Sequence, residues 1–216
     1  DVSSVEAYIN DHKKQRSLLL ARSTLEYSNK LLHSYSNDAT KAYKELNVDL
    51  DKYTRAFDVI DVLYQSLRTS LNVYSTYEGV SDRISDYKKL LDDYNQKVIK
   101  RKRISIADTL LIGINKRAIE NIAKEGEYLY KSVSDLVLYA TGAAACSTAD
   151  LLVVLESINT SLDNIEKHLN KSYFESWRYI QVRIGYWKEK VYRTKSKQQI
   201  LEDAFGRWRV AGKLEK

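Results

Sequence analysis

Proline and methionine are both absent from this chain of 216 residues, and glycine occurs only seven times. Because proline breaks helix interiors and glycine weakens them, a chain with so little of either is free to form long helices. The single cysteine, Cys146, excludes an internal disulfide. No run of about 18 apolar residues is present, so the sequence predicts no membrane-spanning segment.

The missing methionine extends to position 1, which is Asp1. Because protein synthesis starts with methionine, we expect that the front of the chain was processed or cut. Removal of a signal peptide and removal of an expression tag both account for this. The first predicts a location in the cell envelope or periplasm, and the alternative is the cytoplasm.

The most regular pattern that is present is a heptad seam between Leu46 and Tyr74. Its apolar residues are spaced alternately four and three apart, which is typical of a helix that packs along its whole length. Tyrosines fill several of these positions, where we expect the ring to pack and the hydroxyl to reach water. The seam consists of Leu46, Leu50, Tyr53, Phe57, Ile60, Tyr64, Leu67, Leu71 and Tyr74.

Few helix-breaking or helix-capping residues separate the seams. We expect the first helix to run almost unbroken from Ser4 to Tyr77, and a break near residues 36–38 or at Asn47 is the alternative. Gly79 predicts the first helix stop, followed by a seam over residues 80–98. A further apolar face spans residues 104–140, where Ile104 and Ala107 are its first members.

The second arm contains four consecutive cations, Lys100-Arg101-Lys102-Arg103. On a helix they would point in all directions, so we interpret them as a solvated helix junction, with binding of phosphate or an acidic partner as the alternative. Ser105 or Asp108 would cap a fresh helix if the chain breaks after this run.

Gly142 marks a loop, and Ser147 with Asp150 forms a capping box for the last long helix. Its seam runs over residues 151–169, slips by one residue near Tyr173, and resumes at Trp177. Such a slip is a stutter, which unwinds a supercoil locally without ending the helix. The resumed seam is Trp177, Ile180, Ile184, Trp187 and Val191, and a short amphipathic segment around Leu201 and Phe205 follows.

These patterns predict an all-α fold. We expect a single domain, residues 1–216, built as an elongated, coiled-coil-like antiparallel bundle of about three long helices with a short C-terminal helix. Breaks within the long arms would give a shorter bundle of five or six helices.

The net charge of +6 is concentrated in the C-terminal part, residues 171–216, which has 12 basic and 5 acidic side chains. The remaining residues have a net charge of −1. Basic and aromatic residues alternate there along one outer helix face, beside the Trp177 seam. This arrangement suits a nucleic acid, an anionic membrane surface or a protein interface. The candidate interaction face consists of Tyr179, Arg183, Tyr186, Lys190 and Arg193.

No pattern points to chemistry. His12, His33 and His168 are scattered and form no pair with metal-ligand spacing. Neither a glycine-rich phosphate loop nor a nucleophile elbow is present. We interpret Cys146 as a buried or idle thiol. The sequence therefore predicts no catalytic residues, no metal and no cofactor.

Three stretches, residues 50–61 (LDKYTRAFDVID), 130–136 (YKSVSDL) and 179–187 (YIQVRIGYW), resemble plasmid or conjugative transfer proteins of bacterial mobile elements. The resemblance covers most of the chain and implies no catalytic residues. A long three-helix bundle is also similar in outline to minor-pilus components of type IV secretion systems, but shape alone does not establish function.

We therefore expect a non-enzymatic structural or interaction component of a conjugative transfer apparatus, acting through contacts with other proteins. The alternative is an accessory protein that binds nucleic acid with its basic aromatic C-terminal face, although we expect such binding to be weak and non-specific. A third interpretation is a peripheral membrane bundle. The sequence predicts neither the partner's identity nor the oligomeric state.

Overall fold

A computed structural model describes residues 12–44, 50–71, 77–192 and 201–207, and all regular structure in these ranges is helical. The three longest helices are α2 (His12–Lys44), α5 (Thr109–Ala140) and α6 (Thr148–Tyr192). Two shorter ones are α3 (Asp51–Leu71) and α4 (Tyr77–Tyr94). Residues 201–207 form a short C-terminal helix. The predicted all-α fold is confirmed.

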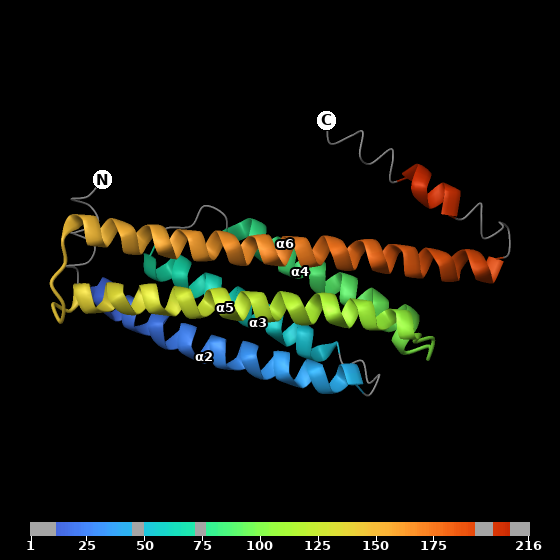
Figure 1. Cartoon of the computed structure of the whole chain (residues 1–216), viewed down its shortest axis with the longest axis horizontal. Helices are drawn as coiled ribbons and strands as arrows, with labels where there is room; N and C mark the ends of the chain where they lie inside the picture. The colour runs from blue at the N-terminus through green and yellow to red at the C-terminus, as the bar shows by residue number, and fades with distance from the viewer. Residues whose placement is uncertain (1–11, 45–49, 72–76, 193–200, 208–216) are drawn as a thin grey trace.

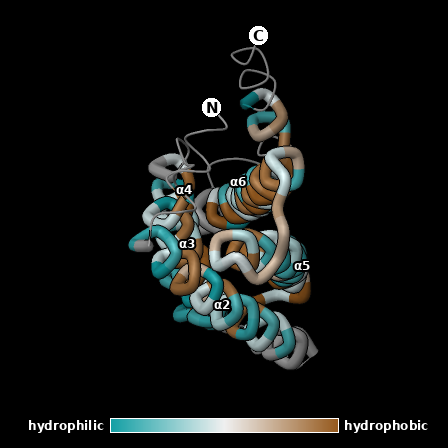
Figure 2. Tube along the Cα trace, turned by 90° about the vertical axis from the view of Figure 1, so that its left-hand side faces the viewer, coloured by the Kyte–Doolittle hydropathy of each residue, from teal (hydrophilic) through white to brown (hydrophobic). Residues whose placement is uncertain are grey.

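The helices form an elongated bundle (Figure 1). Around the long axis each helix packs against two neighbours, in the order α2, α3, α4, α6 and α5, and α5 closes the ring against α2. Figure 2, which looks along the bundle, shows this order. Antiparallel packing is fixed by contacts such as Gln15 Nε2 donating to the Ala140 carbonyl at 2.8 Å, which ties the start of α2 to the end of α5.

The first arm is not one helix. The Ser70 hydroxyl on α3 donates to the Ser17 carbonyl on α2 at 3.0 Å, so the two helices fold back on each other. The expectation of an almost unbroken helix from Ser4 to Tyr77 is therefore wrong, and the alternative of a break at Asn47 agrees with the end of α2 and the start of α3. Because α3 folds back against α2, the two helices bury apolar surface against each other that one continuous helix would leave exposed to water.

The helix stops at the two glycines differ. At Gly142 the backbone φ is +73°, and the Ala143 N–H donates to the Leu138 carbonyl, so α5 ends there as predicted. Gly79 instead lies inside α4, which begins at Tyr77. The boundary predicted at Gly79 is therefore displaced, since a glycine in the exposed first turn of a helix disturbs little.

The heptad seam of α3 is buried as predicted. Every one of its residues from Leu50 to Leu71 is at most 6% exposed, whereas Leu46 and Tyr74 lie outside the described residues. Three tyrosines depart from the expectation of a wet hydroxyl. Tyr64, Tyr87 and Tyr94 are fully buried, and the Tyr64 hydroxyl donates to the Leu162 carbonyl of α6 at 2.7 Å.

The seam of α6 changes phase later than predicted. Trp177, predicted in the resumed seam, is 41% exposed. The buried positions continue through Ser172 and Ser176 and then take a second step of four residues to Ile180, which is buried as predicted. The small serines make room for Tyr87 of α4, whose hydroxyl lies 3.1 Å from the Ser176 hydroxyl. The large side chain that fills this layer of the core is Tyr87 of α4. A search for apolar residues on α6 alone therefore does not identify Ser172 and Ser176 as buried positions.

Candidate interaction site at the α4–α5 junction

The basic run Lys100-Arg101-Lys102-Arg103 lies in a break between helices, which agrees with its interpretation as a helix junction. A π-helical turn, η1 (Asn95–Ile99), ends α4, and a single 3-10 turn, η2 (Ile106–Asp108), leads into α5. Between them Lys102 adopts a positive φ of 52°. Ile104 and Ala107, predicted as seam residues, are exposed because the turn lifts them off the bundle.

Asp108 anchors this junction. Its side chain has no exposed surface, and one carboxylate oxygen accepts the Ser105 backbone N–H at 2.7 Å. Two side chains of α6 complete its shell. Arg183 Nε donates to Asp108 Oδ1 at 3.0 Å, and the Tyr179 hydroxyl donates to the same oxygen. Arg183 also donates to the Arg103 carbonyl, so α6 holds both ends of the turn.

Charge is balanced inside this cluster. Burial opposes ionisation of Asp108, but the hydrogen bonds from Arg183, Tyr179 and Ser105 outweigh it and hold the pKa of Asp108 below its ordinary value. Burial, with the nearby carboxylate, raises the pKa of Tyr179. The Tyr94 hydroxyl is buried beside the same carboxylate, and burial raises its pKa. The cluster is therefore an ionised Asp108–Arg183 pair flanked by two neutral tyrosines.

A second buried polar layer lies about two helical turns further along the bundle. The Tyr87 hydroxyl donates to Asn115 Oδ1 on α5 and lies beside Ser176 on α6. The Asn115 amide also donates to the Leu111 carbonyl at 2.8 Å. Burial raises the pKa of Tyr87 to about 12, so this group stays neutral. Both polar layers fix the register of α4 and α5 against α6.

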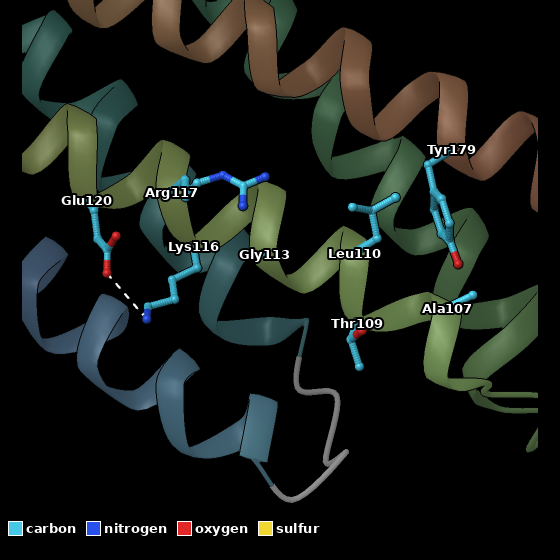
Figure 3. A pocket seen from close by; sticks show the side chains of 8 residues that line it. All are labelled: Ala107, Thr109, Leu110, Gly113, Lys116, Arg117, Glu120 and Tyr179. Atoms are coloured by element: carbon cyan, nitrogen blue, oxygen red, sulfur yellow. Dashed lines mark ion pairs between the residues drawn. The ribbon is translucent and has the colours of Figure 1, made fainter.

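An open groove of about 520 Å³ runs along the outer face of α5 beside the junction. Leu110, Gly113 and Arg117 lie three and four residues apart on one stripe, and Tyr179 reaches the groove from α6 (Figure 3). Leu110 is 55% exposed. Because Gly113 has no side chain, the groove is hollow at its middle. The groove is lined by Ala107, Thr109, Leu110, Gly113, Lys116, Arg117, Glu120 and Tyr179.

The members of the candidate interaction face are not all on the outside. Tyr179 and Arg183 point to the junction, and the Arg183 side chain is only 10% exposed. Their placement on an outer face is therefore wrong, since the buried Asp108 carboxylate recruits them. The side chains of Tyr186 and Lys190, and the whole of Arg193, lie outside the described residues.

The remaining candidate groups lie apart from the junction. His33 is exposed and contacts Glu127 at 2.7 Å, whereas the side chain of His12 lies outside the described residues. Cys146 is exposed, so the thiol is not buried, and its interpretation as an idle thiol stays a prediction. Within the described ranges, no cluster of three or more potential ligand side chains suits a metal ion. None of the helices in those ranges is both long and apolar enough to cross a membrane.

Sequence reasoning identified Asp108 only as a possible helix cap and missed its role as the partner of Arg183. One signal was present: Asp108 is the only acidic residue between Asp93 and Glu120, among seven cations. A lone carboxylate in so basic a segment is a natural partner for a buried arginine.

Comparison with protein-family models, curated proteins and solved structures gives no match. The site is therefore interpreted from its own geometry.

Proposed function

We propose that this chain is a non-enzymatic helical component of a bacterial conjugative transfer apparatus that works by binding a helix of another protein in the α5 groove. The observation that carries the proposal is the hollow at Gly113, bordered by the exposed Leu110 and by Tyr179. Spacing of four and three along this stripe matches the way one helix receives the apolar side chains of another.

The charges around the groove favour an acidic partner helix. Lys116 and Arg117 border it, and Glu120 is already paired with Lys116 at 3.5 Å. The Arg117 guanidinium lies over the hollow, 3.6 Å from the position that a Gly113 Cβ would occupy. A carboxylate on the partner would therefore pair with Arg117 while an apolar side chain fills the hollow.

The alternative of a nucleic-acid-binding accessory has weaker support. It depends on free cations along the candidate interaction face, and Arg183 is held by Asp108 and Arg103. One cation fewer means fewer neutralised phosphates and weaker, less salt-dependent binding.

The test has a cellular and a structural arm. In cells that carry the mobile element, deletion of the coding gene should abolish transfer, and the wild-type gene should restore it. Gly113→Leu fills the hollow, displaces only the end of Arg117, and removes a helix-interior glycine. It should therefore fail to restore transfer although it folds at least as stably as the wild type.

Val153→Leu is the matched control, since Val153 is an exposed apolar residue near the start of α6, far from the α4–α5 junction that α6 contacts at Tyr179 and Arg183. It should restore transfer fully. Unchanged transfer after gene deletion would overturn the assignment to conjugation. Full activity of Gly113→Leu would overturn the groove as the binding site.

A further inference from the structure

The turn at residues 100–106 combines charge and apolar surface at one end of the bundle (Figure 1). Lys100, Arg101 and Lys102 are exposed, and Ile104 is 38% exposed. Ile106 is 78% exposed, the largest value among the exposed large apolar side chains of the described residues. Cations and aliphatic side chains therefore project from the same few residues.

Within residues 94–119 of the sequence, no exposed acidic side chain offsets these cations. Asp108 is the only acid in residues 94–119, and it is buried against Arg183. The segment therefore carries a net positive charge, which an anionic partner complements.

The turn is also held in one conformation. The Lys102 N–H donates to the Ile99 carbonyl at 2.9 Å, and the Arg103 N–H donates to the Val98 carbonyl at 3.0 Å. The Arg103 carbonyl in turn accepts the Arg183 guanidinium. A turn that is already ordered loses less conformational entropy when it binds.

We propose that residues 100–106 form a contact site for an anionic phospholipid membrane. The ammonium and guanidinium groups of residues 100–102 lie among the acidic headgroups, and the side chains of Ile104 and Ile106 enter the boundary between headgroups and acyl chains. The bundle then stands on the membrane surface by its α4–α5 end. This site is separate from the groove, and it goes beyond the proposed function.

Other anionic partners fit this turn less well. Residues 100–110 contain no aromatic side chain on which a base would stack. Aromatic anchors, which are enriched in protein interfaces, are missing for the same reason. Aliphatic side chains that project beside cations at the end of a bundle instead match insertion into a lipid surface.

The experiment is sedimentation of the full chain with vesicles of phosphatidylglycerol and phosphatidylcholine, and with vesicles of phosphatidylcholine alone. We expect binding only to the anionic vesicles, weakening as salt increases. Replacing Lys100, Arg101 and Lys102 together by glutamine should lower the partition coefficient about fivefold for each cation removed.

Ile106→Asp tests the apolar contribution, and it should weaken vesicle binding although all cations remain. Val153→Asp, the same kind of change at the opposite end of the bundle, should bind vesicles like the wild type. Circular dichroism of each variant checks that the helices are retained.

Three results would overturn the proposal. Wild-type vesicle binding by the triple glutamine variant would assign the binding to the basic C-terminal part. Full binding by Ile106→Asp would show that no apolar side chain is inserted. A parallel salt series with DNA that shows tighter binding than to vesicles, lost in the triple variant, would assign the turn to nucleic acid. None of these variants alters the groove. A result that contradicts membrane binding by the turn would therefore not contradict the proposed function.

Discussion

The same motif, serine followed three residues later by aspartate, begins a helix at each end of this bundle, and the two copies do different work. At Ser147 the capping box is reciprocal: Asp150 accepts the Ser147 N–H at 3.0 Å, and the Ser147 hydroxyl accepts the Asp150 N–H at 3.1 Å. This box is exposed. At Ser105 the aspartate is buried, and its carboxylate also binds two side chains of α6.

This difference shows that the capping motif alone does not determine how much its aspartate contributes to the stability of the fold. Hydrogen bonds from Ser147 lower the pKa of Asp150, and hydrogen bonds from Arg183 and Tyr179 help lower that of Asp108. The Asp150 carboxylate is exposed, so water can replace any hydrogen-bond partner that it loses. The buried carboxylate has no such substitute, so its partners become structural requirements.

The largest effect is expected from Arg183→Met. It leaves the Asp108 carboxylate buried without its cation, which should lower the free energy of unfolding by about 3–5 kcal/mol. Arg178→Met, an exposed neighbour on α6, is the control and should change stability by less than about 0.5 kcal/mol. Urea denaturation at neutral pH measures both. Equal losses would show that the Asp108–Arg183 pair does not anchor the junction.

Next in size is the coupling between the two partners. Asp108→Asn alone should also destabilise the protein, because the Arg183 guanidinium is then left buried without a counter-charge. The double variant Asp108→Asn with Arg183→Met should lose less than the sum of the single losses, by about 0.5–3 kcal/mol. Strict additivity in a double-mutant cycle would contradict a direct pair.

At acidic pH, the difference in the free energy of unfolding between the wild type and Arg183→Met should become smaller. Because the folded-state pKa of Asp108 lies below the unfolded value near 3.8, its stabilisation is complete above that value and is lost as pH falls through the folded pKa. In Arg183→Met, protonation instead relieves the buried charge. The stability gap between wild type and variant should therefore narrow between about pH 5 and about pH 2. A gap independent of pH would indicate lost packing and not lost charge.

The smallest effect is expected at the exposed copy. Ser147→Ala removes the hydroxyl that caps the Asp150 N–H, and it should cost about 1 kcal/mol. A loss as large as that of Arg183→Met in the same urea titration would mean that exposure does not separate the two caps.

Sequence reasoning found the helices but not the roles of their polar residues. The seam from Leu50 to Leu71 was predictable because apolar spacing alone reports which helix face is buried. The buried positions of Ser172 and Ser176 were not, since their layer is filled by Tyr87 from a helix distant in sequence. For the same reason, Tyr179 and Arg183 were predicted to lie on an outer helix face. Their partner Asp108 is 71 and 75 residues away in the sequence. Long-range pairing of polar groups leaves no period in the sequence.

The π-helical turn η1 has a consequence for insertions and deletions. A π turn is equivalent to one extra residue within an α-helix. Deleting Gln96 would return the segment Asn95–Ile99 to α-helical geometry and leave the residues after it in nearly the same direction, because four α-helical residues turn the chain about as far as five residues of a π turn. Deleting a residue from the regular part of α4 would instead rotate Lys100, Arg101 and Lys102 by about 100°, since nothing there absorbs the lost residue. The π turn is thus the place where this helix end tolerates a shorter chain without redirecting its charges.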